Sequence, residues 1–170
     1  YIIGGTGPSY SEGGLHSDIL LIKTDENGNE QWSQLYGGEN ADSGYSVQQT
    51  NDGGYIITGH NSDFDIQLIK TDEYGSEEWS QSYEGNIGRS VQQTNDGGYI
   101  IVGSTDVGEF NGYNDNDVYL IKTDGNGNEQ WTQTFGGGED DWGYSVQQTN
   151  DGGYIVTGRT TSFGNGSWDI

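Results

Sequence analysis

Two turns in the sequence carry oxygen-bearing side chains at alternate positions, as calcium-binding loops do. The residues are Asp25, Asn27 and Asn29 in one turn and Asp124, Asn126 and Asn128 in the other. Both turns lack the glycine that a calcium loop has at its sixth position and the acidic residue at its twelfth. A third copy, residues 72–76, loses the alternation, and hairpin turns often have this composition. We therefore expect plain turns and no bound cofactor, with calcium as the alternative.

Residues suited to catalysis are few and scattered. The two histidines, His16 and His60, fall in separate loops and in no recognised metal or nucleophile motif. The acidic run 139–141 could supply the two carboxylates of a glycoside hydrolase. In a chain with 27 acidic residues, however, such runs are usually solvated loops. The sequence thus predicts no catalytic residue, and we expect that the protein is not an enzyme.

The composition is acidic and rich in glycine. The chain has five basic and 27 acidic residues, which gives a net charge of −22. It has 31 glycines and no cysteine or methionine. Nucleic acid is an unsuitable partner for such a chain, because its phosphates need Lys and Arg. No run approaches the roughly 18 apolar residues of a membrane span, and no signal peptide opens the chain. The lack of oxidisable sulfur suits an extracellular or cell-surface location.

An eleven-residue string, SVQQTNDGGYI, occurs without change at 46–56, 90–100 and 145–155. A Lys-Thr-Asp element recurs with it roughly every 50 residues, a period typical of propellers and solenoids. Each period contains four strand-like runs, which in the clearest unit cover 44–50, 54–59, 65–71 and 77–83. We therefore expect an all-β β-propeller segment built of four-stranded antiparallel blades.

The repeated residues have structural explanations. Asn-Asp-Gly supplies the positive φ angles of a tight hairpin between the first two strands of each blade. These turn residues are Asp52 and Gly53, Asp96 and Gly97, and Asp151 and Gly152. The repeated tryptophans, expected to pack between blades, are Trp32, Trp79 and Trp131. The recurring Lys23, Lys70 and Lys122 are expected to form an ion pair or to lie over the tryptophan of the same blade.

The repeat divides residues 1–170 into about three and a half blades of one propeller segment. Two blades are complete, 44–84 and 88–136, and two are partial, 1–37 and 143–170. The chain starts in mid-motif at Tyr1, which indicates a processed chain or a segment of a longer one. One uncovered blade face of roughly 500 Å² forgoes about 12 kcal/mol, against total stabilities of about 5–15 kcal/mol. We therefore expect self-association or further repeats of a longer chain.

The full repeat, LIKTDxxGxxxWxxxxxG followed by SVQQTNDGGYIxxG, resembles the tandem β-propeller repeats of archaeal and bacterial cell-surface proteins. It resembles, more distantly, the tryptophan-docking blades of quinoprotein-like propellers, in which an Asp-Gly turn precedes the Trp. The matching residues are Asp25, Gly28 and Trp32; Asp72, Gly75 and Trp79; and Asp124, Gly127 and Trp131. The first resemblance implies an extracellular structural or adhesive role. The second implies a quinone cofactor and axial calcium, often with vicinal cysteines, which this chain lacks.

Loop lengths vary between the second and third strands of a blade and between one blade and the next. In an up-and-down blade both classes lie on one face of the ring, here called the variable-loop face, and such a face often binds ligands. Its candidate contact residues are Tyr10, His16, Phe110, Tyr113, Trp142, Phe163 and Trp168. They suit sugar stacking or subunit contact, or they simply fill the loops. A sequon at Asn165 predicts a glycosylation site if the source glycosylates its surface proteins.

The uniformity of the blades favours a structural repeat protein of the cell surface or extracellular matrix. We expect it to assemble through blade–blade stacking into a filament or larger array. The alternative is a lectin-like or protein-binding propeller module that uses the variable-loop face to bind glycan or protein.

Overall fold

The computed structural model describes residues 1–11, 14–110 and 113–163, and in this part the chain forms strands and turns without a helix. The strands form four sheets, named here in chain order. The first sheet contains β1 (Ile2–Ser11), β2 (Gly14–Thr24) and β3 (Glu30–Tyr36). The second contains β4 (Ser43–Gln49), β5 (Tyr55–His60), β6 (Ile66–Thr71) and β7 (Glu77–Tyr83).

The third sheet contains β8 (Ile87–Gln93), β9 (Tyr99–Phe110), β10 (Tyr113–Thr123) and β11 (Glu129–Phe135). The fourth contains β12 (Asp141–Gln148) and β13 (Tyr154–Thr160). Each strand pairs antiparallel with the strand that follows it in the same sheet, so every sheet is a simple meander. The predicted all-β class and the four-stranded antiparallel sheets are confirmed.

The Asn-Asp-Gly turn joins β4 to β5, β8 to β9 and β12 to β13. Its Asp accepts hydrogen bonds from the hydroxyl of the preceding threonine and from the N–H of the second glycine, as Asp52 does from Thr50 and Gly54. The first glycine has a φ of 92°, 85° and 88° in the three copies, a region that favours glycine. The turn residues therefore fix the hairpin at the same place in each sheet.

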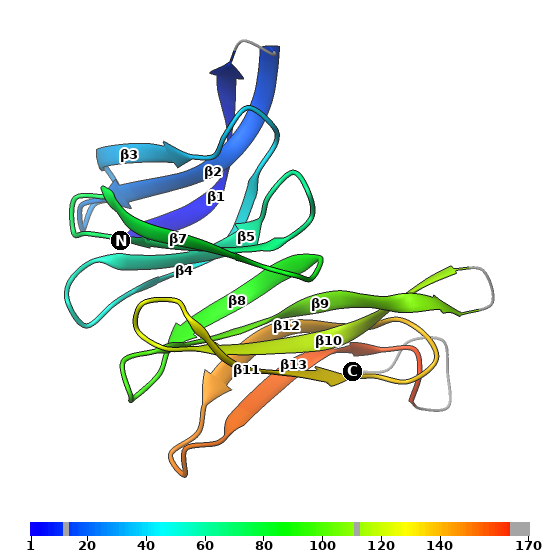
Figure 1. The fold of residues 1–170 in the computed structure, drawn as a ribbon. Coiled ribbons are helices and arrows are strands. Elements are labelled where there is room, and N and C mark those ends of the chain that lie inside the picture. The colour runs from blue at the N-terminus through cyan, green and yellow to red at the C-terminus, as the bar shows by residue number, and fades with distance from the viewer. Residues whose placement is uncertain (12–13, 111–112, 164–170) are drawn as a thin grey trace.

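The four sheets follow one another through the molecule, with the first and the fourth at opposite ends (Figure 1). We call the side of a sheet toward the following sheet its forward face, and the opposite side its backward face. Alternation along β5 sends Ile56 forward, against Val91 and Ile101 of the third sheet, and Ile57 backward, against Ile19 and Leu21 of the first. Both faces are apolar because a sheet lies on each side of this strand.

Three hydrophobic clusters lie between the four sheets, one in each joint between neighbours. The first joins Ile19, Leu21 and Tyr36 to Tyr55, Ile57 and Ile69; the second joins Ile56, Ile66, Leu68 and Tyr83 to Val91, Tyr99, Ile101 and Ile121. The third joins Ile100, Val102 and Leu120 to Val146. The core is therefore a series of similar layers between sheets, each formed by the same repeat positions.

Candidate functional site

Each tryptophan of the repeat packs against the sheet that follows its own. The ring centroids of Trp32 and Tyr55 are 5.9 Å apart, those of Trp79 and Tyr99 are 5.9 Å apart, and those of Trp131 and Tyr154 are 5.8 Å apart. The angles between the rings, 59° to 65°, are close to the edge-to-face arrangement that aromatic pairs favour. The tryptophans thus connect neighbouring sheets.

A glycine of the next sheet lies under the tryptophan ring. A Cβ at Gly75 would lie 2.8 Å from the ring of Trp32, and one at Gly127 would lie 2.7 Å from the ring of Trp79. The φ angles of these glycines are +82° and +78°, so both space and backbone geometry require glycine. The Asp-Gly turn of one sheet is therefore the surface on which the previous tryptophan docks.

A tyrosine hydroxyl closes the same joint. Tyr36 Oη donates a 2.6 Å hydrogen bond to the carbonyl of Gly75, and Tyr83 Oη donates one of 2.6 Å to the carbonyl of Gly127. Burial, with the charges of Glu77 and Asp72, raises the pKa of Tyr36 to about 12. At the corresponding position of the third sheet stands Phe135, which has no hydroxyl and is exposed.

The two glutamines of the eleven-residue string form a ladder between sheets. Gln93 N donates to Gln48 Oε1 at 2.6 Å, and Gln148 N donates to Gln92 Oε1 at the same distance. In return, Gln93 Oε1 and Gln148 Oε1 accept hydrogen bonds from backbone N–H groups of the preceding sheet, those of Asn51 and Asn95. We call this arrangement the glutamine ladder. It explains why both glutamines recur: one reaches forward and the other backward.

Two repeat lysines are buried in cages of oxygen atoms. Lys70 Nζ lies 2.9 Å from Asp52 Oδ2, 2.8 Å from Glu78 Oε2 and 2.9 Å from the carbonyl of Thr71. Burial alone would raise the pKa of Asp52, but hydrogen bonds from Thr50, Lys70 and Gly54 lower it from 3.8 to about 2.

Lys122 Nζ lies 3.0 Å from Asp96 Oδ2 and donates to the carbonyl of Thr123. The hydrogen bond from the Thr94 hydroxyl, with those of Lys122 and Gly98 and against the effect of burial, lowers the pKa of Asp96 to about 2. These lysines tie the Asn-Asp-Gly turn to the third strand of the same sheet, so they are structural rather than anion-binding.

In the calcium-like turns, the carboxylate oxygens accept hydrogen bonds from the same turn. Asp25 Oδ1 accepts from the N–H groups of Asn27 and Asn29, at 2.8 and 2.9 Å, and its Oδ2 accepts from Asn29 Nδ2. Asp124 makes the same bonds with Asn126 and Asn128. These bonds lower the pKa of both aspartates. Across the described residues, no group of three or more His, Cys, Asp or Glu side chains is placed to hold a metal ion.

The predicted contact residues are spread over the molecule. His16 lies in β2 of the first sheet, with Nε2 3.5 Å from Asp18 Oδ1, whereas Trp142 lies in β12 of the fourth and Phe163 is exposed after β13. The side chains of Tyr10, Phe110 and Tyr113 lie outside the described residues, as do Asn165 and Trp168 in full.

Both arginines of the chain lie over Trp142, a predicted contact residue; sequence reasoning missed the arginines. The Cζ of Arg89 lies 5.9 Å from the Trp142 ring centroid, 5.3 Å from that of Tyr45 and 5.7 Å from that of Tyr144. The Cζ of Arg159 lies 5.2 Å from the same tryptophan ring. Arg89 stands where the neighbouring repeats have Tyr45 and Tyr144, and this departure from the repeat was the available signal.

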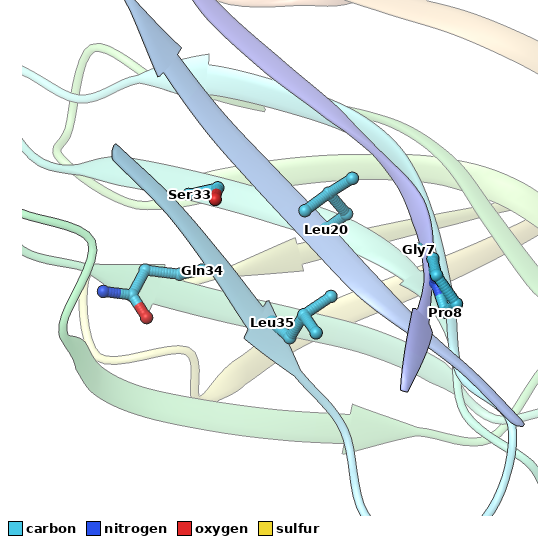
Figure 2. Close-up of a pocket in the computed structure, with 6 residues that line it drawn as sticks. All are labelled: Gly7, Pro8, Leu20, Ser33, Gln34 and Leu35. Atoms are coloured by element: carbon cyan, nitrogen blue, oxygen red, sulfur yellow. The ribbon is translucent and has the colours of Figure 1, made fainter. Parts of the chain in front are cut away.

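Two hollows lie on or between the sheets. One is on the backward side of the first sheet, lined by Gly7, Pro8, Leu20, Ser33, Gln34 and Leu35 (Figure 2). The other lies between the third and fourth sheets, where Val118, Leu120 and Phe135 meet Tyr154, Val156 and residues 158–160. Both hollows contain apolar side chains of the kind that neighbouring sheets cover elsewhere.

No protein-family model matches the chain, and no curated protein is significantly similar to it. In the part of the chain that the structure describes, no helix is available that could cross a membrane.

Proposed function

We propose that this chain is a structural repeat segment of the cell surface or extracellular matrix, built of propeller-type blades, and that it assembles by stacking its terminal sheets on further blades. The observation that carries this proposal is the contrast between the ends of the stack and its middle. Ile3 is 51 % exposed and Ile155 is 57 % exposed, whereas Ile56, Ile57, Ile100 and Ile101 at the equivalent positions are fully buried.

The two terminal faces are complementary because they carry the same repeat positions as the faces that pack together inside the stack. Ile155 belongs to the forward face of the fourth sheet and corresponds to Ile56 and Ile100. Ile3 belongs to the backward face of the first sheet and corresponds to Ile57. In the middle of the stack a forward face packs on a backward face, so the fourth sheet of one copy fits the first sheet of another.

The glutamine ladder also supports stacking that continues beyond the fourth sheet. Gln147 occupies the position from which Gln48 and Gln92 accept a hydrogen bond from the next sheet. In the described residues the Gln147 side chain is exposed and has no sheet in front of it. A further blade would supply the missing N–H.

The arrangement of the first strands supports the propeller interpretation. Strands β4, β8 and β12 are joined in sequence by the glutamine ladder, so they lie side by side across three sheets. In a propeller the first strand of each blade lies nearest the central axis, where blades approach most closely. Together with the four-stranded meanders, this favours a fan of blades over two sheets facing each other.

The test uses two variants that each damage one terminal face. We expect Ile3→Glu and Ile155→Glu each to remove self-association of the 170-residue chain in analytical ultracentrifugation, because a carboxylate would be buried in the joint. Each variant keeps one intact face, so an equimolar mixture should form one-to-one dimers and nothing larger. Tyr74→Glu, in an exposed turn, is the matched control and should associate as the unmodified chain does.

The proposal would be wrong if the unmodified chain is a stable monomer at concentrations up to the millimolar range. Failure of the mixed variants to pair would instead exclude head-to-tail stacking and indicate a self-complementary contact. Electron microscopy of the unmodified chain then separates filaments from closed rings.

The arginine–aromatic group at Trp142 favours a second candidate function, a lectin-like module that binds a carboxylated saccharide. Tyr45 and Tyr144 offer partly exposed rings for stacking, and Arg89 offers a fork of donors that matches a carboxylate. The Nε of Arg89 is buried without an acceptor among the described residues. Calorimetric titration with uronic-acid oligosaccharides tests this function; binding should be lost in Arg89→Gln, and a neutral oligosaccharide should give no signal.

A further inference from the structure

Two pairs of aspartates occupy the same place in the repeat; Asp117 is half-buried and the other three are buried. Asp18 and Asp117 each begin the apolar run of a third strand, five residues before the repeat lysine. Asp42 and Asp141 each stand two residues before the glycine of the following first strand. Asp18 is 5 % exposed, Asp42 6 % and Asp141 2 %, which is unusual for carboxylates.

In each pair the two carboxylates meet over a pair of glycines. At Gly37 a Cβ would collide with the carboxylates of both Asp18 and Asp42, and the N–H of Gly38 donates to Asp42 Oδ2 at 3.1 Å. The second pair repeats this arrangement.

At Gly136 a Cβ would collide with the Asp117 carboxylate, and the N–H of Gly137 donates to Asp141 Oδ2 at 3.0 Å. The Gly-Gly sequence therefore serves to bring two acidic groups together.

Several of the carboxylate oxygens have no hydrogen-bond donor. Oδ1 of Asp18, of Asp117 and of Asp141 is buried and receives no hydrogen bond within the described residues. The same is true of Oδ1 of Asp115, beside the second pair. Lys70 and Lys122 form their ion pairs with other carboxylates. Two histidines lie beside the first pair: His16 Nε2 is 3.5 Å from Asp18 Oδ1, and the charge of His60 acts on Asp42.

Charges buried in this way are expensive unless a counter-charge compensates them. Burial, reinforced by the charge of Asp18, raises the pKa of Asp42 against the hydrogen bonds from the N–H groups of Gly38 and Ser62 and against the charge of His60. Burial and the charges of Asp115 and Asp141 raise the pKa of Asp117. The two pairs therefore need either protons or a cation.

The middle joint of the stack is an internal control. At the position of Asp42 and Asp141 it has Asn86, whose Nδ2 donates to Asn116 Oδ1 at 2.7 Å. A neutral amide with its own partner suffices there, so stacking itself does not require the acidic pair. The aspartate pairs occur in the two units in which a long hairpin joins the second and third strands, β1–β2 and β9–β10. In the middle unit the β5–β6 connection is short.

We propose that each aspartate pair binds one divalent cation with oxygen ligands, Ca²⁺ in the first place, which clamps a long hairpin to the start of the next sheet. Two carboxylates and their unpaired oxygens offer the hard ligands that Ca²⁺ prefers, with backbone oxygens and water completing the shell. The net charge of −22 raises the local concentration of cations around the chain. These sites differ from the calcium-like turns, whose oxygens are already hydrogen-bonded. The inference does not depend on assembly of the chain.

The test is calorimetric titration of the EDTA-treated chain with Ca²⁺, together with thermal unfolding with and without the ion. The unmodified chain should bind two ions and unfold at a higher temperature in Ca²⁺. Asp42→Asn and Asp141→Asn, which copy the natural Asn86, should each bind one ion, and the double variant none. Asp63→Asn, in an exposed turn, is the control and should bind two. If an Asp42 variant fails to fold by circular dichroism, Asp18→Asn tests the same pair.

Absence of Ca²⁺ binding, with an unfolding temperature that Ca²⁺ leaves unchanged, would overturn the proposal in favour of protonated pairs. Unchanged stoichiometry in the double variant would also overturn it, because the ions would then bind elsewhere. Neither result would bear on stacking, which the terminal-face variants test separately.

Discussion

The joint between the second and third sheets and the outer faces of the first and fourth sheets are made from the same repeat positions. In the joint, Ile56 and Ile101 are fully buried, Tyr83 donates to the Gly127 carbonyl, and Trp79 packs on Tyr99. At the ends, the corresponding Ile155 and Ile3 are half-exposed.

Since the residue types are the same, the difference comes entirely from the presence of a neighbouring sheet. Burying one Ile side chain contributes about 1.5–3 kcal/mol, so each uncovered position forgoes a significant part of a domain's stability. The stability of such a chain is therefore a sum over joints rather than a property of single sheets, as in other repeat proteins.

The tryptophans give the largest expected difference between a middle joint and an end joint. Trp79→Ala should destabilise the chain by about 3–5 kcal/mol, because it empties the space between two complete sheets. Trp131 packs on the fourth sheet, which has two strands in the described residues, so Trp131→Ala should lower the free energy of unfolding by clearly less. Urea denaturation followed by tryptophan fluorescence and circular dichroism measures both. Equal losses would mean that the end joint is as well packed as the middle one.

The glutamine ladder gives an intermediate effect. Gln92→Ala removes the acceptor of the Gln148 N–H and should lower the free energy of unfolding by about 1 kcal/mol. Gln147→Ala changes an exposed side chain and should have almost no effect on the isolated chain. If Gln147→Ala lowers the free energy of unfolding only at concentrations where copies associate, this residue lies in the contact between copies.

The smallest effect concerns pH. The pKa of Asp96 is lowered to about 2 in the folded chain, so its contribution to stability is complete above pH 3.8 and is lost as the pH falls through 2. Asp96→Asn should therefore flatten the pH dependence of stability between about pH 4 and 2, modestly, because the carboxylate is more than half exposed. Asp151→Asn is the matched control in the fourth sheet, where the described part has no lysine at this turn. Equal flattening in both variants would mean that Lys122 contributes nothing.

The strands themselves were predictable from the sequence. The expected runs 44–50, 54–59, 65–71 and 77–83 differ by at most one residue at either end from β4, β5, β6 and β7. This precision comes from local causes: apolar alternation and Asn-Asp-Gly turns act within a few residues. The same locality made the Asp-x-Asn-x-Asn pattern ambiguous, because a turn that bonds to itself and a calcium loop share one composition.

The contacts between sheets were not predictable in the same way. The convergence of Arg89 and Arg159 on Trp142 and the meeting of Asp18 with Asp42 join residues from different strands, and their geometry depends on how the sheets stack. A single departure from the repeat, such as Arg89 in place of Tyr, is the only mark that such sites leave in one sequence.

The glutamine ladder has a consequence for how such a chain can change in length. Gln48 with Gln93 and Gln92 with Gln148 form the same bonds between the same atoms, so the ladder strand of one sheet fits behind that of any other. Removing one whole period from the gene would bring two compatible faces together, and duplicating one would insert a sheet that already fits on both sides. A ladder that is the same at both joints thus allows the number of units to grow or shrink by unequal recombination without a compensating substitution in the ladder.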